Sequence, residues 1–140
     1  MKVGAGLIPL LGGLQREMSK IFNMENAKRV DTPGVSTMRW LLDREVGATK
    51  MMAALYDYEP NLRMERLHYH VSRESAYLVL EGEARIHLNG EEHKLGPETV
   101  VYISPGDVHA VVGTGVEGLK LLEVWSPAER DIVYLDERPK

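Results

Sequence analysis

Histidines in two short stretches are the residues of this chain whose type and spacing could do chemistry. His68 and His70 flank Tyr69, and His109 follows the turn-like segment Ser104-Pro105-Gly106-Asp107-Val108. Side chains two residues apart project to the same side of a strand but not of a helix. If that side is the inside of a barrel, three neutral imidazoles face one point and form a site for Zn, Fe, Ni, Cu or Mn.

A His-x-His pair on an exposed loop is common, and such a pair by itself is weak support for a metal site. Here three of the five histidines lie in the two stretches, which are bounded by strand-like runs and by turn residues. His87 and His93 instead flank a predicted hairpin turn, as ordinary surface residues do. We therefore expect a metal site at the first three histidines only.

The composition bounds the class of protein. A chain of 140 residues has room for one domain with a substantial core. The net charge of -4, with acidic and basic residues interspersed, offers no basic patch for phosphates, so we expect no nucleic-acid partner. The absence of cysteine excludes disulfides, zinc-thiolate sites and a thiol nucleophile.

The first part of the chain has helical periodicity. Apolar residues recur at three- and four-residue spacing between Leu7 and Phe22, which predicts an amphipathic helix over residues 10–23, weakened by Gly12 and Gly13. Such a helix would cover a barrel mouth or a partner subunit. Its polar face is not strongly basic and no apolar stretch approaches about twenty residues, so we expect no membrane association. The first 14 residues lack a small-x-small cleavage site, and we expect them to be retained in a cytoplasmic protein.

From Val35 onward the sequence is typical of β structure. Turn residues about every eight to twelve positions separate short apolar runs, which favours an all-β closed barrel or jelly roll. Asn89-Gly90 suits a type I′ hairpin, and Pro105-Gly106 suits a type II turn. Residues 132–135 form one more apolar piece that could pair along a sheet edge or across a dimer. The expected strands cover residues 36–42, 50–58, 62–70, 76–80, 84–88, 91–95, 99–103, 109–112 and 119–125.

The order of these motifs resembles the cupin superfamily, in particular its small, single-domain, RmlC-like members. The resemblance covers roughly residues 60–125 and rests on His68-Tyr69-His70, Glu74, the segment 77–83 with Gly82, Asn89-Gly90 and the segment 104–109. It implies a double-stranded β-helix, or jelly-roll barrel, over residues 26–126. A helical extension, residues 1–25, would precede the barrel, and a tail, residues 127–140, would follow it. Cupins include oxygenases, isomerases, epimerases, lyases, sensors and storage proteins, so the resemblance is specific for fold and not for reaction.

The resemblance also implies one divalent transition metal, Fe, Mn, Ni or Zn, held by two histidines and a glutamate of the first motif and by a histidine of the second. His68, His70 and His109 match that pattern. The glutamate normally stands seven residues before the motif glycine, and that position is Ser75, with Glu74 one residue early. Either a shorter spacer or a bulge brings Glu74 to the metal, or the centre holds three histidines and a water.

Strand alternation also predicts the pocket wall. Arg66, Ser75 and Tyr77 would face inward, with Tyr102 or Val101 beside them. An inward Arg66 needs a counter-charge, such as a substrate carboxylate or phosphate, and the alternative is that it lies at the rim in solvent. Tyr77 or Glu74 would serve as acid or base.

The function that these residues predict is that of a metal-dependent enzyme acting on a small polar molecule, either an oxygenase or a sugar-phosphate isomerase. Two alternatives stay open. One is a cupin that binds a small ligand or a metal without turnover, as a sensor does, and the other is a metal-free, epimerase-like barrel with a histidine base. The apolar N-terminal segment and the apolar tail both need a surface to cover, so we expect a homodimer.

Overall fold

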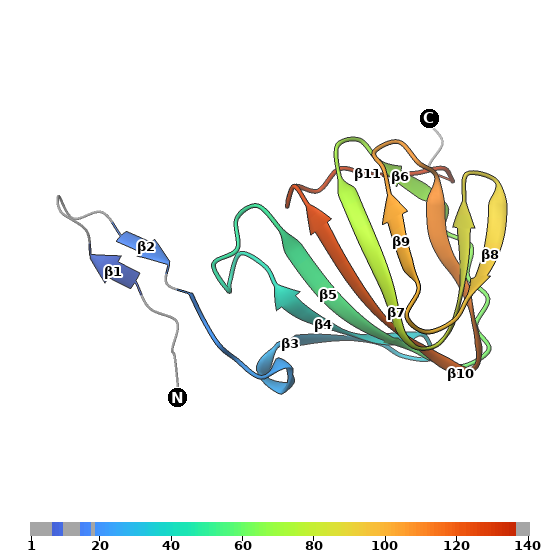
Figure 1. Ribbon diagram of the computed structural model, residues 1–140, viewed down its shortest axis with the longest axis horizontal. Helices are drawn as coiled ribbons and strands as arrows, with labels where there is room; N and C mark the ends of the chain where they lie inside the picture. The colour runs from blue at the N-terminus through green and yellow to red at the C-terminus, as the bar shows by residue number, and fades with distance from the viewer. Residues whose placement is uncertain (1–6, 10–14, 18, 137–140) are drawn as a thin grey trace.

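The computed structural model of this chain describes residues 7–9, 15–17 and 19–136, and the regular secondary structure of these residues is strand apart from one 3-10 turn. A sheet of nine antiparallel strands rolls into a barrel, in the order β11-β6-β10-β5-β4-β3, with β7 pairing with β10, β8 and β9 (Figure 1). The all-β jelly roll predicted from the sequence is confirmed. Its strands are β3 (Lys28–Thr32), β4 (Ser36–Leu42), β5 (Met52–Tyr58), β6 (His68–His70), β7 (Glu74–Leu88), β8 (Glu91–Leu95), β9 (Val100–Ile103), β10 (His109–Ser126) and β11 (Ile132–Tyr134).

Two long strands, β7 and β10, form the centre of the barrel and pair with each other along most of their length. Each of them replaces two of the shorter strands expected from the sequence. Gly82, which was expected to end a strand, instead bends β7, with φ at +79°. A Cβ at Gly82 would lie 2.1 Å from the carbonyl oxygen of Gly118, so only glycine fits this bend.

The core lies on the inner face of these two strands. Alternate residues of β7 are buried, as a strand with one face inward requires. Opposite them on β10 lie Trp125, Glu123 and Leu121. Each fully buried large apolar side chain stabilises the fold by about 1.5–3 kcal/mol. The core cluster consists of Tyr77, Val79, Ala84, Ile86, Ile103, Leu119 and Leu121.

Two turns that the sequence predicts are confirmed, and one of them positions a site residue. Asn89 and Gly90 have φ values of 47° and 90°, the positive signs that a type I′ hairpin requires. Gly106 has φ at 86°, and the amide of Asp107 donates to the carbonyl of Ser104 at 3.1 Å. This second turn reverses the chain directly before β10 and so sets the direction in which His109 enters the barrel.

The helix predicted over residues 10–23 is wrong for the part of it that the structure describes. Gln15–Glu17 form a short strand, β2, which pairs with β1 (Leu7–Pro9), and Met24–Asn26 form a single 3-10 turn. Residues 10–14 and 18 lie outside the described residues. A helix needs a surface against which to pack its apolar face, and Ile21 and Phe22 stay 71% and 41% exposed.

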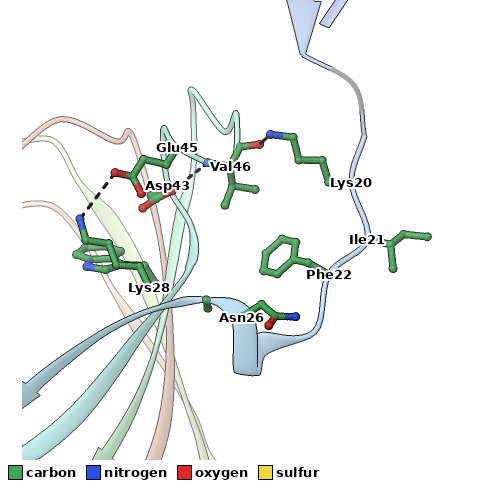
Figure 2. Close-up of a pocket in the computed structure, with 10 residues that line it drawn as sticks. Lys20, Ile21, Phe22, Asn26, Lys28, Asp43, Glu45 and Val46 are labelled. Carbon is green, nitrogen blue, oxygen red and sulfur yellow. Dashed lines mark hydrogen bonds and ion pairs between the residues drawn. The ribbon is translucent and has the colours of Figure 1, made fainter. Parts of the chain in front are cut away.

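The N-terminal segment contacts the loop between β4 and β5, where Lys20 Nζ donates to the carbonyl of Val46 (Figure 2). Within the barrel, Lys28 of β3 lies 3.9 Å from the Glu45 carboxylate of the same loop. Phe22 points toward the barrel and Ile21 points away from it (Figure 2). No helix among the described residues is long and apolar enough to span a membrane.

The last described strand, β11, completes the edge of the chain's own sheet. Ile132 pairs with His70, and Tyr134 pairs with His68. The sequence allowed residues 132–135 to pair either along a sheet edge or across a dimer, and the structure has the sheet-edge pairing. The homodimer stays a prediction.

Replacing Gly82 with alanine tests the bend in β7. Because a Cβ there meets backbone atoms at a positive φ, we expect Gly82→Ala to lower the free energy of unfolding by about 2 kcal/mol or more in urea denaturation. Gly96→Ala is the matched control, since nothing lies within 4 Å of a Cβ at Gly96. Its effect should stay within about 0.5 kcal/mol, and equal losses in the two variants would contradict this description of the bend.

Candidate metal centre

Strands β6 and β10 bring the three predicted histidines together inside the barrel. His68 pairs directly with His109 across the two strands, and His70 follows on the same face of β6. One nitrogen of each ring lies within 4.8 Å of the corresponding nitrogens of the other two. His70 and His109 are buried, at 2% and 0% exposure. The convergence predicted from the sequence is confirmed, and this group could hold a metal ion.

Hydrogen bonds orient all three rings in the same way. Nδ1 of His68 donates to the carbonyl of Arg66 at 2.9 Å, and Nδ1 of His109 donates to the carbonyl of Asp107 at 2.9 Å. Nδ1 of His70 lies 3.0 Å from the Asp131 carboxylate. These acceptors place the proton on Nδ1 and leave the lone pair on Nε2, the arrangement that metal-ligating histidines adopt.

The donor set fits a divalent transition metal. Nε2 of His109 is buried and has no hydrogen-bond partner among the described residues. A buried acceptor without a partner is costly, and a metal ion would satisfy it. Burial is the main cause that lowers the pKa of His70 and of His109 to about 4. The rings are therefore neutral at pH 7, as ligands must be.

Asp131 orients the ring of His70 through Nδ1. Asp131 was not identified as a site residue from the sequence, because it was assigned there to the polar C-terminal tail. Burial raises its pKa, but donors outweigh burial and hold the pKa of Asp131 below its usual value. These donors are the backbone amides of Ser72 and Arg73, both at 2.8 Å, and the Ser72 hydroxyl at 3.1 Å. An ionised Asp131 stabilises the Nδ1–H form of His70 and raises the basicity of the ring.

A cavity of about 300 Å³ opens beside the histidines. Four tyrosines line it, and Tyr56 and Tyr58 stack with their ring centroids 5.5 Å apart. Met64, Val111 and Leu121 add apolar wall. Such a lining suits a small, planar or ring-shaped organic molecule better than a highly charged one.

A buried charged pair, Glu123 and Arg73, lies in the same cavity. Arg73 Nη1 is 3.7 Å from Glu123 Oε2, and their side chains are only 15% and 9% exposed. Burial raises the pKa of Glu123 to about 7, against the opposing effect of Arg73. Such a carboxyl group can take up or release a proton near neutral pH.

Arg73 also touches the metal centre directly. Its Nη1 donates to Nε2 of His70 at 3.2 Å, and its guanidinium lies 4.5 Å from the centre of the Trp125 ring. Because Nε2 is also the atom that His70 would offer to a metal, this hydrogen bond has to open when a metal binds. Sequence reasoning missed both Arg73 and Glu123. The sequence pattern could have indicated Glu123, because it lies two residues from each of the apolar residues Leu121 and Trp125. Alternation along β10 therefore turns all three side chains to the inside.

The structure separates the other predicted site residues. Tyr77 is buried in the cavity wall, with its ring centroid 6.1 Å from that of His109, and Ser75 is buried on the same face of β7. Arg66 lies at the rim, with its side chain 57% exposed and its guanidinium 3.9 Å from the centre of the Tyr134 ring. Of the two positions expected for Arg66, the structure therefore has the one at the rim.

Glu74 and Tyr102 lie on the outer surface and not in the pocket. The Tyr102 hydroxyl donates to Glu74 Oε1 at 2.8 Å, and both residues are exposed. The expectation that Tyr102 lines the pocket is therefore corrected, since its neighbour Val101 packs against the core. β7 runs without a bulge from Glu74 to Ser75, so alternation turns Glu74 outward. Among the residues that the structure describes, the group of possible ligands contains three histidines and no carboxylate.

Comparison with known proteins agrees with the fold described above. Residues 54–125, half of the chain, match the family described as Cupin domain. The chain belongs to the cupin family.

Several solved structures share this fold over most of the chain. The polyketide cyclase RemF from Streptomyces resistomycificus aligns with a TM-score of 0.70 and 27% identity, over 86% of this chain and 88% of that one. Pac13, a nucleoside dehydratase, aligns with a TM-score of 0.67 and 14% identity, over 84% and 92%. KdgF from Halomonas sp. aligns with a TM-score of 0.66 and 16% identity, over 81% and 97%. The last two likenesses show the fold alone.

A curated relative matches over part of its length. Mannose-1-phosphate guanylyltransferase ManC from Salmonella typhimurium (strain LT2) is 34% identical to this cupin over 76 residues, which are 52% of this chain. The matched region spans about 15% of that enzyme.

Metal binding at the three histidines can be tested by stoichiometry. We expect the purified cupin to bind one divalent transition metal per chain, measured by elemental analysis after dialysis against Zn²⁺, Fe²⁺, Mn²⁺ or Ni²⁺. His109→Ala removes a buried ligand and should reduce the bound metal to below one tenth. His93→Ala, on exposed β8, is the matched control and should retain one equivalent. Equal loss, or equal retention, in the two variants would contradict the assignment.

Proposed function

We propose that this cupin is a metal-dependent enzyme that applies acid–base chemistry to a small carbonyl compound, as a cyclase or a dehydratase does. The observation that carries the proposal is a cavity lined by His68, His70 and a buried carboxyl group, Glu123, whose pKa is about 7. His109 converges with the other two histidines behind the wall of this cavity. The 27% identity to a polyketide cyclase over nearly the whole of both chains supports this reaction class.

A divalent metal held by His68, His70 and His109 would act as a Lewis acid toward a carbonyl oxygen of the substrate. Glu123 then acts as the general base, because its carboxylate can take a proton from the carbon next to that carbonyl. The resulting carboxylic acid can return the proton to an oxygen that leaves as water. A carboxyl group with a pKa near 7 can do both without a large cost at neutral pH.

Arg73 and the tyrosines place the substrate and Glu123 relative to each other. The guanidinium of Arg73, 3.7 Å from Glu123, offsets the charge when Glu123 ionises. Tyr77 keeps its proton at neutral pH, because burial raises the pKa of its hydroxyl well above the usual value. It is therefore a hydrogen-bond donor to the substrate and not a base.

Sugar-phosphate isomerase is the second candidate. The local match to an enzyme named for mannose 1-phosphate favours it, and isomerisation also begins with removal of a proton next to a carbonyl. Glu123 would then have the same role on a different substrate. A sensor that binds without turnover needs no base of this kind, and an oxygenase needs none to activate dioxygen.

Proton exchange on a model ketone tests the proposal without the natural substrate. In D₂O with one equivalent of Zn²⁺, we expect the protein to catalyse exchange of the methyl protons of acetophenone, followed by NMR, faster than the free ion does. The rate should rise with pH through a midpoint near 7, because the base must be ionised. Exchange that occurs only with a sugar phosphate would favour the second candidate.

Two variants separate catalysis from general effects of charge. Glu123→Gln should slow exchange about 100-fold and remove the dependence on pH. Glu74→Gln is the matched control, since Glu74 faces the outside, and it should exchange at the rate of the parent. The proposal would be overturned if Glu123→Gln exchanged protons as fast as the parent. It would also be overturned if the protein exchanged the protons of neither acetophenone nor a sugar phosphate faster than the free ion does.

A further inference from the structure

A second cavity, of about 280 Å³, lies next to the histidine cavity. Arg73, Ile132 and Tyr134 line both, so the two cavities adjoin at these side chains. The second cavity has its own wall, formed by Trp40, Met52, Trp125, Ala128 and Arg130. The chemistry described above uses none of these five residues.

The two arginines that line this second cavity differ in their partners, and none of the described residues that line it is Asp or Glu. Glu123, at 3.7 Å, and Asp131, at 3.9 Å, offset the charge of Arg73. Arg130 is exposed and makes no ion pair or hydrogen bond with any described residue. An arginine at such a mouth is available to an anion from outside.

Two residues that line the second cavity, Arg73 and Trp125, each carry a buried hydrogen-bond donor that lacks an acceptor. Nε of Arg73 and Nε1 of Trp125 are buried and have no hydrogen-bond partner among the described residues. The nearest carboxylate to Arg73 Nε is that of Asp131, at 3.9 Å, which is too far for a hydrogen bond. Arg73 Nη1 is already engaged on the histidine side. Buried donors without acceptors are costly, and an oxygen-bearing anion would satisfy them.

The remaining wall is aromatic and apolar. Trp40 and Trp125 meet edge to face, with ring centroids 5.7 Å apart, and Met52 lies beside them. This combination suits a planar group that carries a negative charge, because the rings can pack on its face while arginine donors bind its oxygens.

We infer that the cavity formed by Trp40, Trp125, Arg73 and Arg130 is a carboxylate subsite, which takes the acidic end of a planar organic molecule. The identity of the whole substrate rests in addition on the proposed function. Because the two cavities adjoin at Arg73, the substrate of the enzyme is a planar keto acid. Its carbonyl group reaches the histidines and its carboxylate reaches the arginines.

Tryptophan fluorescence reports this subsite directly, since the two tryptophans of the chain both line it. We titrate the metal-free parent protein with benzoate and with benzamide, its neutral analogue of the same shape. Benzoate should quench or shift the emission in a saturable way and bind at least about tenfold more tightly than benzamide. Inorganic phosphate, which lacks a planar body, should produce no saturable change. Equal binding of benzoate and benzamide, or saturable binding of phosphate, would overturn the inference.

Arg130→Gln tests the charge at the mouth with little risk to the fold, because the side chain is exposed. It should weaken benzoate about tenfold or more and leave benzamide unchanged. Arg85→Gln, which removes the same charge from the β7–β8 hairpin, is the matched control and should bind benzoate as the parent does. Benzoate binding that is equally strong in Arg130→Gln, or equally weakened in both variants, would overturn the inference.

The same titration in His109→Ala separates this inference from the proposed function. Benzoate binding that persists there assigns the carboxylate to the arginines, whereas loss of binding in this metal-free variant would place benzoate at the histidines and overturn the subsite. If acetophenone is not exchanged and benzoate still binds through Arg130, the proposed function fails and the subsite stands.

Discussion

The pairing of β6 with β10 is the constraint on which the rest of the site depends. It sets His68 opposite His109, and the two-residue repeat of a strand then brings His70 to the same face. A shift of one residue in this register would turn His68 and His70 away from His109. The backbone also fixes the rings, because the carbonyls of Arg66 and Asp107 accept from Nδ1 and leave Nε2 free. The strands therefore determine both the position of each ligand and the nitrogen that it offers.

The electrostatics follow from what lies around this group. Glu74 faces outward, so the possible ligands are neutral, and a bound divalent metal would keep its full charge. Three of the charged residues near the histidines, Arg73, Glu123 and Asp131, form one buried network, and Arg66 lies at the rim. Asp131 stays ionised and orients His70, whereas burial holds the pKa of Glu123 near 7. Two neighbouring carboxyl groups thus take two roles, because Asp131 accepts several hydrogen bonds whereas Glu123 lies buried beside the guanidinium of Arg73.

The sequence predicted the residues that obey local rules. Strand alternation and turn chemistry were sufficient for the three histidines, for the turn before His109 and for the hairpin at Asn89-Gly90. The helix over residues 10–23 was predicted wrongly, because periodicity says nothing about whether a surface exists for Ile21 and Phe22 to cover. Asp131 and Arg73 were missed because they come from a tail and a loop. Only the long-range pairing of β11 with β6 brings that tail back to the histidines.

X-ray absorption spectroscopy on the cupin loaded with one equivalent of Zn²⁺ is the most direct test of the three-histidine centre. We expect three imidazole nitrogens at about 2.0–2.1 Å, completed by oxygen from water, and no carboxylate ligand. The outer-shell scattering characteristic of imidazole should weaken in His109→Ala. A spectrum that requires two or fewer imidazoles, or that is the same in His109→Ala as in the parent, would contradict the account.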